Sequence, residues 1–168
     1  DIDNLVGGSN TDAFNISDTI VVTGTIDGNA GSDTLNLSAY ATARTVVINA
    51  TSTAAGFAGT EASVAGGFAD IDVLSLPAGV GDSLQGGNFA NAFAITTADA
   101  GTLTENANVL TFTGANSLTG GTSTDSFTLS GTGTLSGSIA GGGGAGANTL
   151  QGNNVANTWT IRSPDAGT

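Results

Sequence analysis

Apolar residues alternate with small or polar residues in short segments spread along the chain. The clearest examples are Phe14/Ile16, Phe93/Ile95, Phe127/Leu129 and Trp159/Ile161. A period of two with aromatic and branched side chains predicts short strands that bury one face. No segment carries an apolar stripe at the 3.6-residue spacing of an amphipathic helix. The pattern therefore predicts an all-β protein with essentially no helix.

One stretch of the chain occurs twice. Residues 83–102 and 149–168 are identical at 11 of 20 positions without a gap, and two weaker copies begin at Asn4 and Ser117. Each copy has a leucine, a glycine turn, an Asp or Asn, and then an aromatic residue. The leucines are Leu5, Leu84, Leu118 and Leu150, and the aromatic residues are Phe14, Phe93, Phe127 and Trp159. Copies of this kind indicate a repeat architecture in which like residues stack and face inward.

A β-sandwich would also use many short strands. It gives no reason, however, for copies spaced 34 and 32 residues apart, as Leu84, Leu118 and Leu150 are. A parallel β-helix (β-solenoid) does, and this length of chain would form about six or seven coils. We expect one domain over residues 1–168, with the Ala- and Gly-rich stretch 50–67 as an irregular excursion. The chain itself is expected to be a segment of a longer repetitive protein.

The composition restricts the function. The chain carries 14 acidic residues against Arg44 and Arg162, so its net charge is −12, and we expect neither nucleic acid nor anionic lipid as a partner. His, Cys and Lys are absent, which removes the usual catalytic bases and nucleophiles. The carboxylate pair Asp70/Asp72 could act as acid and base, or could be a solvated strand end. Glu61 and Glu105 are predicted to lie in polar loops. The chain is not expected to be an enzyme.

Three segments carry a resemblance to a known family. They are GGSNTDAFN (7–15), GNAGSDTLN (28–36) and GGTSTDSFT (120–128). These segments resemble the haemolysin-type calcium repeat, G-G-x-G-x-D-x-U-x. The wider sequence resembles tandem β-solenoid repeats of giant secreted bacterial surface proteins, of the filamentous-haemagglutinin-like and calcium-repeat adhesin type. The resemblance implies a right-handed parallel β-helix, a location outside the cell or on its surface, and a structural role in a stalk or filament.

The same resemblance makes Asp12, Asp33 and Asp125 the candidate metal ligands, with calcium as the ion. The family's nonapeptides run in tandem, whereas these copies are isolated, and a calcium ion needs six to eight oxygen ligands. The other interpretation is that these aspartates form turns and bond backbone amides nearby or on a neighbouring coil. No catalytic or cofactor-binding residue is predicted.

The function predicted from the sequence is therefore a structural repeat segment of an extracellular bacterial adhesin stalk or surface filament. Its expected partners are neighbouring repeats of the same protein, or identical subunits stacked end to end. A calcium-stabilised repeat module is one alternative. An ice-binding solenoid is another, because Thr-x-Thr pairs such as Thr111/Thr113 are frequent.

Overall fold

The computed structural model describes residues 2–51, 56–79 and 81–158. Their strands form two mixed sheets of eight strands each, and no residue described is helical. Sheet A contains, in spatial order, β1 (Leu5–Val6), β3 (Ile26–Asp27), β7 (Val64–Ile71), β6 (Phe57–Glu61), β5 (Thr45–Thr51), β9 (Ser83–Gln85), β13 (Ser117–Thr119) and β15 (Ile139–Ala140). Sheet B contains β16 (Thr149–Gln151), β14 (Ser126–Leu129), β10 (Ala92–Thr97), β11 (Ala100–Glu105), β12 (Asn108–Thr113), β8 (Val73–Ser75), β4 (Thr34–Asn36) and β2 (Ala13–Asn15).

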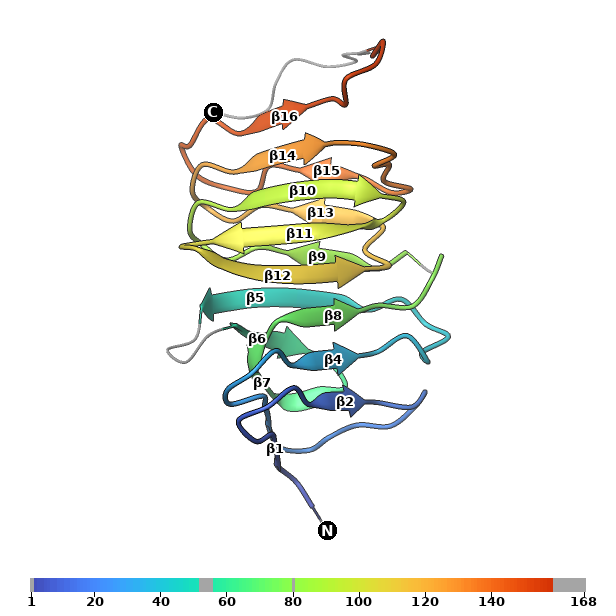
Figure 1. Cartoon of the computed structure of the whole chain (residues 1–168), viewed down its shortest axis with the longest axis vertical. Coiled ribbons are helices and arrows are strands. Elements are labelled where there is room, and N and C mark those ends of the chain that lie inside the picture. The colour runs from blue at the N-terminus through green and yellow to red at the C-terminus, as the bar shows by residue number, and fades with distance from the viewer. Residues whose placement is uncertain (1, 52–55, 80, 159–168) are drawn as a thin grey trace.

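Most neighbouring strands are parallel, and the chain alternates between the sheets. β1 leads into β2, β3 into β4, β9 into β10 and β13 into β14. Ten of the pairings among the described strands are parallel. The strands consequently stack along the long axis of the molecule, with β1 and β2 at one end and β15 and β16 at the other (Figure 1).

Four pairings are antiparallel, which the repeat pattern did not predict. They belong to two three-stranded meanders, β5–β6–β7 in sheet A and β10–β11–β12 in sheet B. In each meander the chain moves ahead along the stack and then returns, so β7 pairs with β3 and β12 pairs with β8 (Figure 1). The described part of the stretch 50–67, expected to be an irregular excursion, contains the end of β5, all of β6 and the start of β7. The pairings of β6 with β5 and β7 include register shifts, and Phe57 and Val64 are buried in the core.

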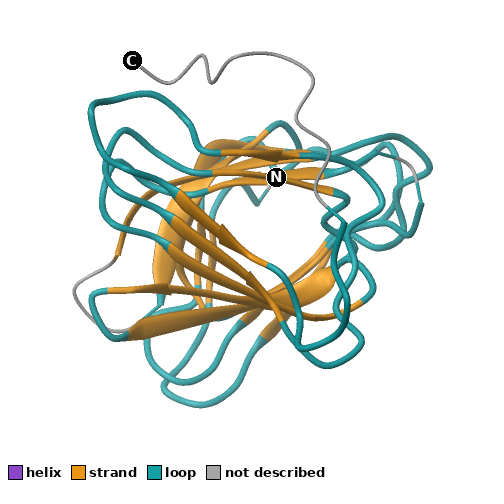
Figure 2. Ribbon diagram, turned by 90° about the horizontal axis from the view of Figure 1, so that it is seen from above, coloured by secondary structure: helices purple, strands orange, loops and turns teal. Residues whose placement is uncertain are grey.

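The core lies between the sheets and is one continuous apolar cluster. Seen along the stack, the strands surround this interior and the loops project outward (Figure 2). The prediction of inward-facing residues is confirmed for Leu84, Leu118, Phe93 and Phe127, which are almost completely buried. Phe93 lies directly below Phe127 in register, and their rings stack with centroids 4.9 Å apart.

The residues at the two ends of the stack are less covered. Leu5 and Phe14 pack against the core but are only partly buried. Leu150, in contrast, has 45% of its surface exposed. It lies in sheet B beside Phe127, whereas Leu84 and Leu118, its counterparts in the sequence repeat, pair in sheet A. Trp159 lies outside the described residues.

Candidate functional site: buried rows of carboxylates and amides

Polar side chains form rows along the stack at the corner where the chain enters sheet B. The lower row consists of Asp12, Asp33 and Asp72, each directly preceding a strand of sheet B. The N–H of Asp12 donates to Asp33 Oδ1 at 2.8 Å, and the N–H of Asp33 donates to Asp72 Oδ2 at 2.9 Å. The turn itself is closed by a bond from the Gly8 N–H to Asp12 Oδ2 at 2.6 Å.

The upper row continues this arrangement with amides. It consists of Asn91, Asp125 and Asn148, which precede β10, β14 and β16. The N–H of Asn91 donates to Asp125 Oδ1 at 3.0 Å, and the N–H of Asp125 donates to Asn148 Oδ1 at 2.7 Å. The Asn91 side-chain amide donates a second bond to Asp125 Oδ1, at 2.7 Å. We call each level of the stack a rung. In both rows, the backbone N–H on one rung donates to the side chain on the next rung.

The three predicted metal ligands are thus placed in two different rows. Asp12 and Asp33 are neighbours in the lower row, and Asp125 lies in the middle of the upper row. All three bond the backbone of their own turn or of an adjacent rung, the arrangement that the turn interpretation predicts. No group of three or more His, Cys, Asp or Glu suited to a metal ion occurs in the described part of the chain.

Sequence reasoning missed Glu105, which it placed in a polar loop. Glu105 ends β11 and is 1% exposed, with its side chain on the inner face that also carries Leu103. The pairing of β10 and β11 begins with Ala92 opposite Thr104, and Asn91 and Glu105 are the next residues beyond this pair. Neither carboxyl oxygen of Glu105 has a hydrogen-bond partner, and Oδ1 of Asn91 has none either. Burial raises the pKa of the Glu105 carboxyl, because a low-dielectric surrounding disfavours the charged form.

The lower row has a perturbed carboxyl of its own. The pKa of Asp72 is raised, chiefly by burial and further by the negative charges of Asp33 and Asp70, although the bond from the Asp33 N–H opposes the shift. Asp72, one member of the pair Asp70/Asp72 considered for catalysis, accepts the Asp33 N–H in this row. In the sequence, Asp72 could have been recognised as a member of the row because it begins the same Asp-x-Leu-x-Leu pattern as Asp33.

A second corner, where the chain enters sheet A, uses the same chemistry. Asp82 Oδ1 accepts the N–H of Arg44 at 2.5 Å, and Asn116 Oδ1 accepts the N–H of Asp82 at 2.7 Å. The Asn116 amide donates in turn to Asp99 at 3.1 Å and to Ser136 at 2.9 Å. Burial raises the pKa of Asp82, while the Arg44 N–H and the Arg44 charge lower it by a smaller amount.

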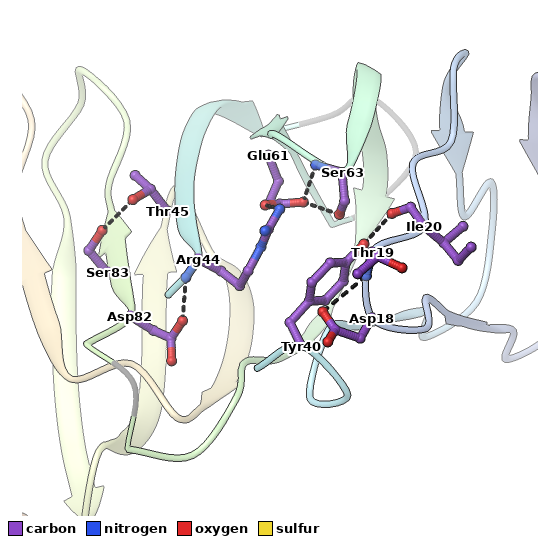
Figure 3. Close-up of polar contacts among 10 residues, drawn as sticks. All are labelled: Asp18, Thr19, Ile20, Tyr40, Arg44, Thr45, Glu61, Ser63, Asp82 and Ser83. Carbon is purple, nitrogen blue, oxygen red and sulfur yellow. Dashed lines mark hydrogen bonds and ion pairs between the residues drawn. The ribbon is translucent and has the colours of Figure 1, made fainter. Parts of the chain in front are cut away.

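Arg44 anchors the meander of sheet A (Figure 3). Its guanidinium forms an ion pair with Glu61, which is 5% exposed, and lies over the ring of Tyr40 at 4.2 Å from the centroid. Glu61 also accepts the hydroxyl of Ser63 and its backbone N–H, the latter at 2.8 Å. Glu61 was predicted to lie in a polar loop, but it ends β6 and is buried, so its charge is neutralised where β6 turns into β7.

Close contact between stacked corners explains their glycines. Gly121 lies on Gly87, and a Cβ on Gly121 would be 1.8 Å from the Gly87 carbonyl oxygen. A side chain at this position would hold adjacent rungs apart, so the corner motif requires glycine for packing.

Comparison of the chain with protein-family models, with curated proteins and with solved structures finds no match. The arrangement of the residues must therefore carry the functional argument. Within the described residues, no helix is long and apolar enough to cross a membrane. The buried carboxylates and amides bond mainly to neighbouring rungs, so the chemistry that this site supports is the alignment of one strand on the next.

Proposed function

We propose that the chain is a structural segment, a right-handed parallel β-helix of about six or seven coils within an extracellular adhesin stalk or surface filament. The observation that carries the proposal is the continuous stacking of strands along one axis around a single apolar core. In such a stack each rung contacts only its neighbours, so the structure can be lengthened without redesign.

The polar rows support a load-bearing role. The bonds within them run along the stack, and each joins residues at least 21 positions apart, as in Asp12–Asp33 and Asn91–Asp125. Force applied along the axis must break these bonds together with the backbone ladders. The acidic surface of the protein suits solubility outside a cell.

The location outside the cell rests on the resemblance of segments 7–15, 28–36 and 120–128 to secreted repeat proteins. Antibodies raised against the chain test this on intact cells of the source organism. Labelling of unpermeabilised cells is expected, whereas labelling only after permeabilisation would contradict the proposed location.

The mechanical role can be tested by single-molecule force spectroscopy on the chain fused between two marker domains. We expect stepwise lengthening, because neighbouring rungs are released in small groups. The trace should be the same in calcium and in chelator. Extension without measurable resistance would contradict a load-bearing role, and a rise in unfolding force with calcium would favour the calcium-stabilised module instead.

A second candidate function, ice binding, is favoured by the outward face of sheet B. The described strands of this sheet direct no charged residue outward, although the protein is strongly acidic. The Thr-x-Thr pairs Thr102/Thr104 and Thr111/Thr113 lie on adjacent strands, with Thr102 opposite Thr111. Neighbouring strands are about 4.8 Å apart, so Thr102 and Thr111 lie side by side on this face, while Thr104 and Thr113 are opposite Val109 and Ala100.

Thermal hysteresis measures this second candidate directly. If the face binds ice, the wild-type protein depresses the freezing point and Thr111→Lys abolishes the effect. Thr60→Lys, on an exposed position of β6 in sheet A, serves as the matched control and should leave it intact. Absence of hysteresis in the wild type would exclude ice binding.

A further inference from the structure

Three sites in the sequence match the acceptor motif for N-linked sugars, Asn-x-Ser/Thr. They are Asn15-Ile16-Ser17, Asn36-Leu37-Ser38 and Asn49-Ala50-Thr51. In this motif the side-chain nitrogen of the asparagine receives the sugar, and the third residue supplies a hydroxyl. A sugar is bulky and hydrophilic, so its asparagine must lie on the surface of the folded protein. The structure therefore distinguishes the three sites.

The first two motifs lie in regular parallel ladders of sheet B, and their asparagines bond each other. Asn15 is paired with Asn36 in register, and Asn36 is paired with Ser75 on its other side. Asn36 Nδ2 donates to Asn15 Oδ1 at 2.8 Å, and Asn36 Oδ1 accepts the N–H of Ser38 at 3.1 Å. Because the two amides lie against each other, a sugar on either of them would disturb this contact.

Asn49 has a different environment, on the outer face of sheet A. Along β5, Val46 and Ile48 are buried, so Asn49 points to the opposite face, where it is exposed. The pairing of β5 with β6 shifts register between Ile48 and Ala50, so Asn49 is the additional residue of a β-bulge. A bulge releases a residue from the regular ladder and re-aims its side chain. No hydrogen bond joins the Asn49 side chain to another described residue.

The surface around Asn49 leaves room for a sugar. Asn49 lines an open hollow of about 310 Å³ that extends over β3, β7, β6 and β5, and this volume lies in the range of small-ligand pockets. Part of the lining consists of glycines, which have no side chain to fill the space: Gly59, Gly66 and Gly67. Asp27 and Thr60 also line the hollow and can bond the hydroxyl groups of a sugar.

We infer that Asn49 is the site at which this chain is modified with an N-linked sugar. The inference rests on the proposed location outside the cell, because the acceptor motif is used in secreted proteins. The sugar is then confined to the face formed by sheet A, and the outward face of sheet B stays bare.

The modification is a group transfer that needs a glycosyltransferase and a sugar carried on a phosphate. Asn49 Nδ2 attacks C1 of the sugar, the bond between C1 and the phosphate oxygen breaks, and an Nδ2–C1 bond forms. The phosphate leaves with the bonding electron pair, and one proton of Nδ2 passes to a base of the transferase.

The positions of the two arginines allow a direct test by mass spectrometry. Trypsin cleaves after Arg44 and Arg162, and the chain has no lysine, so digestion separates Asn15 and Asn36 from Asn49. The protein isolated from cells of the source organism should carry added sugar mass on the fragment 45–162 alone. Tandem mass spectrometry should place this mass on Asn49, the one asparagine of the fragment that lies in an acceptor motif.

Variants expressed in the same cells test the motif itself. Asn49→Gln moves the amide by one methylene and Thr51→Ala removes the hydroxyl, so each should abolish the added mass completely. Thr51→Ser keeps a hydroxyl and should retain the sugar. Asn36→Gln is the matched control in sheet B and should also retain it. Circular dichroism and a melting curve confirm that the variants are folded.

The outcomes separate this inference from the proposed function. Cell-surface protein whose fragment 45–162 has the mass of the unmodified sequence overturns the inference and leaves the stalk function standing. Sugar on residues 1–44, or added mass on 45–162 that survives Asn49→Gln, also overturns it. Protein found only inside the cells contradicts the proposed location, and the mass of its fragment 45–162 still decides whether Asn49 is modified.

Discussion

The lower and upper polar rows both bind the backbone N–H groups at successive corners of the stack, but they do so with different side chains. The lower row stacks three carboxylates, Asp12, Asp33 and Asp72, and each of them accepts a backbone N–H. The upper row places the single carboxylate of Asp125 between the amides of Asn91 and Asn148. Asp125 is completely buried, whereas Asp12 lies at the end of the stack.

Both rows contain an almost completely buried carboxylate, Asp33 or Asp125, and they differ in the charge of its neighbours. An amide carries donors and acceptors without a net charge, so it can be buried at lower cost than a carboxylate. Repulsion within the lower row contributes to the raised pKa of Asp72. The upper row has one carboxylate, and the buried Glu105 at the end of β11 has no hydrogen-bond partner and a pKa that is raised by burial.

The largest expected effect on stability comes from replacing an amide of the upper row with a carboxylate, as in the lower row. The Asn91 amide donates to the carbonyls of Gly87 and Phe89, both at 2.9 Å, and to Asp125. Asn91→Asp would turn a carboxylate toward these three oxygens and should lower the free energy of unfolding by about 3 kcal/mol. The midpoint of urea unfolding measures the loss.

Asn157→Asp is the matched control for this variant. Asn157 makes the same turn bonds, to the carbonyls of Asn153 and Val155 at 2.8 Å each, but it is exposed. The loss there should be below about 1 kcal/mol, since water can solvate the new charge. Equal losses at the two positions would show that the turn alone, and not the buried row, sets the cost.

A smaller, pH-dependent effect is expected at Glu105. Its folded-state pKa is raised, so the folded protein binds this proton more tightly than the unfolded chain does. The destabilisation from its charge is present in full above the folded-state pKa and disappears as the pH falls to the ordinary value for glutamate. Glu105→Gln should therefore stabilise the protein at pH 7 by about 1 kcal/mol, with the gain vanishing near pH 4.

Melting curves of Glu105→Gln and the wild type across this pH range test the assignment. Glu61→Gln provides a contrast, because it breaks the ion pair with Arg44 and should destabilise the protein at neutral pH. A gain at Glu105 that is independent of pH would mean that its charge is not the cause.

The smallest effect on stability is expected from reducing the charge repulsion within the lower row. Asp72→Asn keeps an oxygen that can accept the Asp33 N–H and removes one of three stacked charges. We expect a gain of about 0.5 kcal/mol that declines with added salt, because screening already reduces the repulsion in the wild type. A loss of stability in low salt would show that the charged form of Asp72 is needed for the bond.

Much of the local structure could be predicted from the sequence. Period-two alternation gave the all-β class, and the recurring Leu and Phe positions gave the inner face at Leu84, Leu118, Phe93 and Phe127. The aspartates singled out at the corners do occupy equivalent turns. Their role as calcium ligands stays a prediction, as do the adhesin function and the handedness of the proposed β-helix.

The sequence alone determined the conformation of the corner turns, because the hydrogen bonds that close them join residues close together in the chain. The turn bonds of Asn91 and Asn157 span two to four residues, and they are the same although Leu84 and Leu150 begin them in different sheets. The tertiary structure decided the rest. The sheet that each copy joins, the two meanders and the burial of Glu105 depend on pairings between distant residues, such as Ile26 with Phe68. No local pattern encodes which of several similar strands will lie alongside, since all present the same alternation, and only the packing of the whole stack distinguishes them.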